Sequence, residues 1–167
     1  MKQYVYEVLE EVTKARTRDE KVKLLKSNES WALKDIIRGS MDSNVVWNLP
    51  AGQPPYTASP AHHHPANLLR ENTKFKYFVK GGPGEKMQKY KREQIFIGIL
   101  EGVHPEDAKL VVSMINKQNI KGLTFMGLMQ FQTDLRLDVE KLNVALLLHR
   151  IGNIIFQTLD THRSWSR

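Results

Sequence analysis

The stretch EQIFIGILEGVHPEDAKLVVSMI, residues 93–115, decides the fold class. Its first half is apolar on most sides, which predicts a largely buried helix that ends at Gly102. In the next segment, Pro105 stands at a first helical position, and Glu106 and Asp107 face the positive end of a helix dipole. The buried stripe of this second helix is predicted to comprise Leu110, Val111, Met114 and Ile115. Two consecutive helices indicate a helical protein.

The residues before this stretch predict three short helices. The first is amphipathic, and its apolar residues are Tyr4, Val5, Val8, Leu9 and Val12. Thr17-Arg18-Asp19-Glu20 is typical of a capping box that begins the second helix. The third helix carries Trp31, Leu33, Ile36 and Ile37 and is expected to stop at Gly39, because glycine tolerates the left-handed conformation after a helix end.

The remaining segments complete the predicted domain. Five prolines make residues 43–67 a long proline-rich loop, and a helix is expected over residues 85–101, with its basic first half in solvent. A long C-terminal helix over residues 139–161 has an apolar surface wider than one stripe. The sequence therefore predicts an all-α bundle of about six to seven helices, with one domain over residues 1–161 and a short basic tail at 162–167.

The composition limits the partners and the chemistry. The 167 residues contain 25 Lys and Arg against 18 Asp and Glu, a net charge of +7 that favours anionic partners. The absence of cysteine excludes disulfides, thiol nucleophiles and cysteine-ligated zinc. No apolar run has the length of a membrane span, and acids stand where a signal peptide would be apolar. We therefore expect a cytoplasmic protein with no membrane partner.

The positive charge is concentrated in the basic stretch Arg70–Arg92, RENTKFKYFVKGGPGEKMQKYKR. Residues 51–100 contain eight basic and three acidic residues, so they supply +5 of the +7. Seven of the eight are the candidate nucleic-acid contacts Lys74, Lys76, Lys80, Lys86, Lys89, Lys91 and Arg92. Aromatic residues stand among them, namely Phe75, Tyr77, Phe78 and Tyr90. This pattern fits a nucleic-acid surface, but it equally fits a solvated helix face whose aromatic residues belong to the core.

Other motifs give weaker indications. The turn from Asn119 to Thr124 leads into another predicted helix and could hold a phosphate, although an ordinary helix connection explains it as well. Adjacent histidines at 62–64 lack the spacing that places two ligands on one helix face, so we expect no metal site. No nucleotide-binding or hydrolase motif is present, which predicts a protein without enzymatic activity or a cofactor.

Two segments resemble a known family. EQIFIGILEGVHPEDAKLVVSMINKQNIKGLTFMGLMQFQTDL, residues 93–135, and the opening VLEEVTKARTRDEKVKLLKSNESWALKDIIRGSMDSNVVWNLP are similar to the N-terminal helical DNA-binding domain of phage-type ATP-dependent DNA ligases. That resemblance implies a domain that wraps duplex DNA by its backbone, with a phosphate clamp formed by Lys117, Lys121, Gly122 and Thr124. The Lys-x-Asp-Gly adenylation motif is missing, so the chain is not a ligase. Short proteins of large tailed cyanobacterial phages also look similar over the whole length.

Two functions follow as expectations. The first is a phage-encoded accessory protein that binds nucleic acid, DNA more than RNA, in the host cytoplasm. The second is a phage structural or host-interaction protein, for example a virion component, that oligomerises or docks through its C-terminal helix. The contact residues of that partner interface would be Leu147, Ile151 and Ile154.

Overall fold

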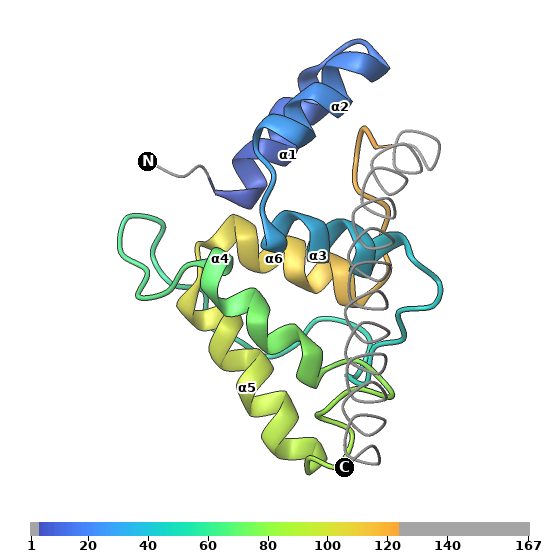
Figure 1. Ribbon diagram of the computed structural model, residues 1–167. Helices are drawn as coiled ribbons and strands as arrows, with labels where there is room; N and C mark the ends of the chain where they lie inside the picture. The colour runs from blue at the N-terminus through green and yellow to red at the C-terminus, as the bar shows by residue number, and fades with distance from the viewer. Residues whose placement is uncertain (1–3, 124–167) are drawn as a thin grey trace, which may run out of the picture. The chain divides into compact units, whose positions relative to one another are not determined.

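The computed structural model describes residues 4–123, and within them the chain forms only helices and loops (Figure 1). The all-α prediction is confirmed. The elements in order are α1 (Val5–Lys14), α2 (Arg18–Ser27), α3 (Trp31–Met41), α4 (Leu68–Glu71), the 3₁₀ helix η1 (Asn72–Tyr77), α5 (Lys89–Gly102) and α6 (Pro105–Ile115).

Helix α6 lies at the centre of this unit, because it packs on α1, α3 and α5. Its inward residues Ala108, Val111 and Met114 are fully buried. The helix begins as the sequence predicts, with Pro105 in the first turn. The His104 ring completes this start, since its Nδ1 accepts a hydrogen bond from the Glu106 amide at 3.2 Å.

Helices α1 and α2 form a hairpin (Figure 1). The predicted capping box is confirmed: the Glu20 amide donates to Thr17 Oγ1 at 3.3 Å, and the Thr17 amide donates to the Glu20 carboxylate at 3.2 Å. These two bonds satisfy amides that the first turn of a helix leaves unpaired. The start of α2 is therefore fixed by residues only three positions apart.

Helix α3 corrects one prediction. It continues to Met41 instead of stopping at Gly39. Gly39 is needed for close packing, because a Cβ there would lie 2.5 Å from the Trp47 ring and 2.6 Å from Met114 Sδ. Trp31, the first residue of α3, is 75% exposed.

Helix α5 starts at Lys89, four residues after the predicted start, and residues 85–88 before it are not helical. The loop before α4 packs on the segment that leads to α5. An isolated antiparallel bridge joins Trp47 to Val79, and the Asn48 amide donates to the Phe78 carbonyl at 2.6 Å. This pairing brings the start of the proline-rich loop against the basic stretch.

All described residues belong to one unit of the chain. The predicted helix at 139–161, the tail at 162–167 and the partner residues Leu147, Ile151 and Ile154 lie outside the described residues. None of the helices between residues 4 and 123 combines the length and apolar character of a membrane span.

Candidate nucleic-acid interface

The basic stretch runs from α4 through η1 and a turn-rich connection into the first turn of α5. Its lysines all lie at the surface, as the sequence predicts; they are Lys74, Lys76, Lys80, Lys86, Lys89 and Lys91. An exposed ion pair is weak and is screened by salt, so a paired lysine can still contact a phosphate, but a lysine without a partner does so without losing a contact. The partners of each ammonium group therefore rank the lysines as phosphate contacts.

Three of these lysines have partners. Lys74 Nζ lies 2.6 Å from the Glu71 carboxylate, and Lys89 Nζ lies 3.8 Å from that of Glu93. Lys76 Nζ lies 5.3 Å from the centroid of the Tyr77 ring. Lys80, Lys86 and Lys91 have no ion pair or side-chain hydrogen bond to any residue between 4 and 123. These three lysines have the least engaged ammonium groups among the lysines of the stretch, and exposed Arg70 likewise has no ion pair with residues 4–123.

Arg92 departs from the predicted interface. It is only 6% exposed, although the basic first half of its helix was expected in solvent. Its Nε donates to the Asn48 carbonyl at 2.7 Å, and its Nη1 donates to the carbonyls of Gly84 and Met87, each at 3.2 Å. The guanidinium group thus joins the proline-rich loop to the connection before α5. Arg92 is a structural residue, and its charge is directed at backbone oxygens instead of solvent.

The sequence left open whether the aromatic residues of the basic stretch lie in the core or on a nucleic-acid surface, and the structure shows both buried and exposed rings. Phe75 and Phe78 are 4% and 0% exposed, so they belong to the core. The Phe78 ring also contacts Phe96 edge-on, with centroids 5.5 Å apart. Tyr90, by contrast, is 60% exposed between Lys89 and Lys91. Only Tyr90 keeps the combination of exposed ring and basic neighbours that nucleic-acid surfaces use.

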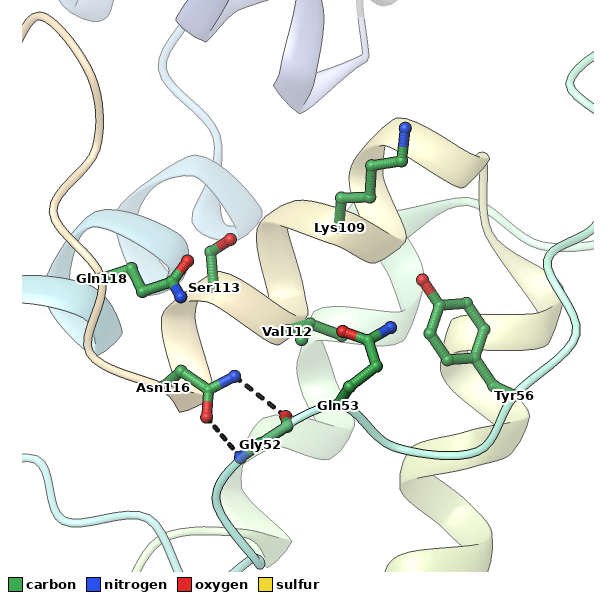
Figure 2. Close-up of a pocket in the computed structure, with 8 residues that line it drawn as sticks. All are labelled: Gly52, Gln53, Tyr56, Lys109, Val112, Ser113, Asn116 and Gln118. Carbon is green, nitrogen blue, oxygen red and sulfur yellow. Dashed lines mark hydrogen bonds between the residues drawn. The ribbon is translucent and has the colours of Figure 1, made fainter.

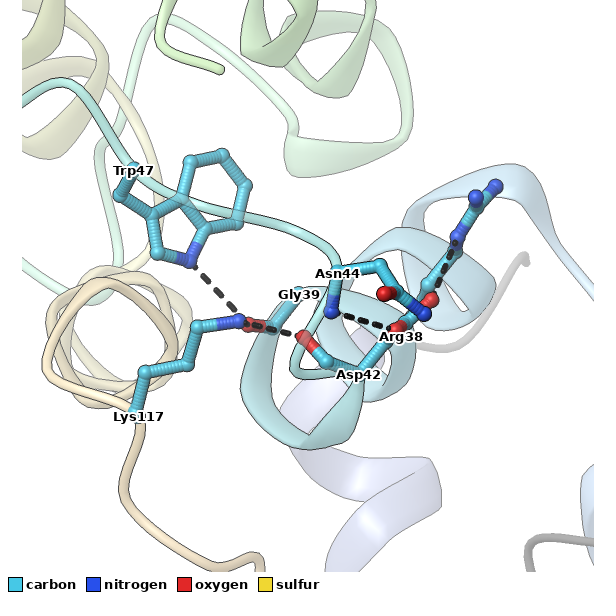
Figure 3. A network of polar contacts seen from close by, with 6 residues as sticks. All are labelled: Arg38, Gly39, Asp42, Asn44, Trp47 and Lys117. Atoms are coloured by element: carbon cyan, nitrogen blue, oxygen red, sulfur yellow. Dashed lines mark hydrogen bonds and ion pairs between the residues drawn. The ribbon is translucent and has the colours of Figure 1, made fainter. Parts of the chain in front are cut away.

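Lys117 has a structural contact in place of the expected phosphate (Figure 3). Its Nζ donates to the carbonyl oxygens of Gly39 at 2.7 Å and Asp42 at 2.8 Å, which caps the C-terminus of α3. Trp47 Nε1 donates to the same Gly39 carbonyl at 3.1 Å. Partial burial of the ammonium group lowers the pKa of Lys117. Lys117 itself adopts φ 55°, so it is the left-handed residue that follows α6.

The rest of the predicted clamp also makes internal contacts. Thr13 Oγ1 donates to the Lys121 carbonyl at 3.0 Å, and Lys21 Nζ donates to the Gly122 carbonyl at 2.6 Å. Gly122 has φ 78° and lies against Thr13, where a Cβ would approach the Thr13 Cα to 3.0 Å. The Lys121 side chain is exposed. Thr124, where the amides of the next helix would begin, lies outside the described residues.

A cluster of aromatic and titratable residues joins the proline-rich loop to α1 and α6. His64 Nε2 lies 3.1 Å from Tyr4 Oη, and the His104 ring stacks on Tyr6 with centroids 4.6 Å apart. Burial and then the nearby His64 lower the pKa of His104. Asp107 accepts a hydrogen bond from the Tyr6 amide at 2.9 Å, and burial raises its pKa to about 6. The sequence placed these residues in unrelated motifs and gave no signal that they meet.

This cluster does not form a metal site. Within residues 4–123, no group of three or more histidines and carboxylates could hold a metal ion. Its rings pack against one another, and His104 Nδ1 is used by the Glu106 amide. The cluster therefore acts as a packing contact between three segments.

A polar cleft of about 500 Å³ lies between α6 and residues 52–56 (Figure 2). The Asn116 side chain holds the loop in place by accepting from the Gly52 amide at 2.7 Å and donating to the Gly52 carbonyl at 3.0 Å. Lys109, its one charged lining residue, pairs with Glu106 at 2.6 Å. The cleft therefore adds little to the uncompensated positive charge.

These observations define an all-α protein with a lysine-rich surface segment built on buried Arg92. Residues 8–121 match a family of unknown function, DUF6433, and the chain belongs to that family. The matched range includes every element from α2 to α6. No curated protein and no solved structure matches the chain.

Proposed function

We propose that this protein is a non-enzymatic accessory protein that binds nucleic acid by its sugar-phosphate backbone with little sequence readout. One observation carries the proposal: Lys80, Lys86 and Lys91 are exposed and lack a carboxylate partner among residues 4–123. Cations that displace counterions from a polyanion give affinity without base contacts. The resemblance to ligase DNA-binding domains supports DNA as the polyanion and a phage as the source.

The start of α5 strengthens this electrostatic argument. Helix N-termini carry partial positive charge, and acids in the first turn usually compensate it. The first turn of α5 has no acid, and Gln88 makes no side-chain cap there. Lys89 and Lys91 add positive charge where the helix dipole is already positive. A bound phosphate would supply the missing negative charge.

The proposed contact surface differs from the one that the family resemblance implied. The Lys117 ammonium group donates to carbonyl oxygens inside the protein, so the exposed Lys121 side chain is the only cation of the predicted clamp left free for a phosphate among the described residues. Arg92 is also excluded, because its guanidinium group is buried. We therefore propose that the six exposed lysines of the basic stretch contact the phosphates, with Lys80, Lys86 and Lys91 at the centre of the surface.

A fluorescence anisotropy titration tests the proposal. Labelled single-stranded and duplex DNA, and RNA of the same length, are titrated with the full chain at about 50 and 200 mM salt. The test variant replaces Lys80, Lys86 and Lys91 by glutamine. The matched control replaces Lys14, Lys23 and Lys109, exposed lysines of α1, α2 and α6, so that both variants carry +4 in place of +7.

The two variants should separate local charge from net charge. Losing three phosphate contacts lowers the slope of log affinity against log salt by about 2 to 3 and weakens binding by about tenfold or more. The control should keep most of the wild-type slope. Wild-type protein that binds no nucleic acid, or equal losses in the two variants, would refute the proposed surface.

A further inference from the structure

The exposed ring of Tyr90 is unusual for its segment. The other aromatic residues of the basic stretch are accounted for by packing: Phe75 and Phe78 lie in the core, and Tyr77 is half-buried with Lys76 against its ring. Tyr90 is 60% exposed and makes no ring or cation contact with residues 4–123. Its flat face is therefore open to a ligand.

The position of Arg92 fixes the direction in which Tyr90 points. Successive residues of an α-helix are separated by about 100° around its axis, so residues two apart lie about 160° apart. Arg92 is held inside by three carbonyl groups. Tyr90 therefore projects away from the core, with Lys89 and Lys91 on either side of it. The hydrogen bonds of buried Arg92 hold this turn of α5 in place. Binding a ligand there therefore costs little backbone conformational entropy.

We propose that Tyr90 stacks on an unpaired base while the lysines around it hold the adjacent phosphates, so that the ligand of this surface is single-stranded nucleic acid. The inference rests on the proposed function and names its substrate class. In a duplex, both faces of each internal base are covered by neighbouring bases, so a ring on a helix surface has no base face to contact. In a single strand the base faces are open, and stacking tolerates any sequence. This matches a surface that combines exposed lysines with an exposed ring.

The test compares three labelled ligands of equal length in anisotropy titrations with the full chain. They are an oligothymidylate, the same backbone with abasic sites in place of the bases, and a duplex. The variants are Tyr90→Ala, Tyr90→Phe and Trp31→Ala. Trp31 is the matched control because it is 75% exposed, has Lys34 Nζ 4.8 Å from its ring centroid and lies outside the basic stretch.

Tyr90→Ala should weaken oligothymidylate binding by about 5- to 150-fold, the equivalent of one lost base stack. The same substitution should leave abasic-strand and duplex binding within about twofold, since neither ligand offers an open base face. Tyr90→Phe should bind like the wild type because it keeps the ring, and Trp31→Ala should also be unchanged.

The possible failures are distinguishable. If the lysine variant is weakened but Tyr90→Ala binds oligothymidylate like the wild type, the stacking inference is wrong and the proposed function stands. If the wild type binds the abasic strand as tightly as the oligothymidylate, the stacking inference is wrong and the proposed function stands. The same conclusion holds if Trp31→Ala loses as much oligothymidylate affinity as Tyr90→Ala. If the wild-type protein binds none of the ligands, both the stacking inference and the proposed function are wrong. Because Tyr90 is exposed, thermal melts of its variants should match the wild type, so a binding loss reports on the ring.

Discussion

Replacing Arg92 should destabilise the protein far more than replacing any neighbouring lysine. In Arg92→Met the carbonyl groups of Asn48, Gly84 and Met87 lose their shared donor, while the methionine still fills much of the buried space. Hydrogen bonds to charged groups contribute about 1.5–3 kcal/mol each, and leaving buried acceptors unpaired adds to the loss. Because the three bonds share one side chain and water can reach part of the site, we expect a total loss of about 3–5 kcal/mol.

The measurement is urea unfolding of the full chain, followed by circular dichroism. With a denaturant slope of about 2 kcal/mol per molar, the midpoint of Arg92→Met should fall by about 2 M. Arg92→Lys should lose less, because an ammonium group can still donate to the carbonyls, although it lacks the planar fork of arginine. The control is Lys91→Met, which removes an exposed charge from the same turn and should change stability by less than about 0.5 kcal/mol. A loss below about 1 kcal/mol for Arg92→Met would refute the structural role.

Gly39, Lys117 and Asp107 give three further tests. Gly39→Ala should cost about 1–3 kcal/mol despite its better helix propensity, because the new Cβ would collide with Trp47; thermal melts would show it. Lys117→Met should cost about 1–2 kcal/mol in urea unfolding by removing the two bonds that cap α3, and an unchanged midpoint would contradict that cap. Burial raises the pKa of Asp107 to about 6 in the folded chain, so the folded state binds more protons than the unfolded state from about pH 4 to 6. Stability therefore falls as pH rises through this window, by about 3 kcal/mol in all. Asp107→Asn should remove that slope and be the more stable protein at neutral pH, as melts over a pH series would reveal.

The sequence predicted those features that depend on nearby residues. The Thr17 capping box and the start of α6 at Pro105 involve positions within one helical turn, so their signals are local. The buried stripe of α6 is also correct for Val111, Met114 and Ile115, since apolar spacing reports directly on the buried face. These local rules were sufficient for the fold class.

The errors involve partners that are distant in sequence. Arg92 and Lys117 bind backbone carbonyls, and every residue has a carbonyl, so no sequence pattern marks those that will receive a cation. Gly39 fits both a helix end and a close contact, and only the position of Trp47 distinguishes the two. The surface position of the six lysines was therefore predicted correctly, and the exposure of Arg92 was predicted wrongly.

The contacts between the two ends of the helical unit also have a consequence for synthesis on the ribosome. Thr13 bonds to Lys121, Lys21 to Gly122 and Tyr6 to Asp107, which are pairs separated by 108, 101 and 101 positions. The α1–α2 hairpin emerges first, yet none of these anchors exists until about a hundred further residues have been added. At translation rates of about 5–20 residues per second, about 5–20 s pass between synthesis of the hairpin and synthesis of the residues that it contacts. During that interval its apolar face has no permanent cover, so the nascent chain is most exposed to aggregation and chaperone binding before residue 122 leaves the exit tunnel.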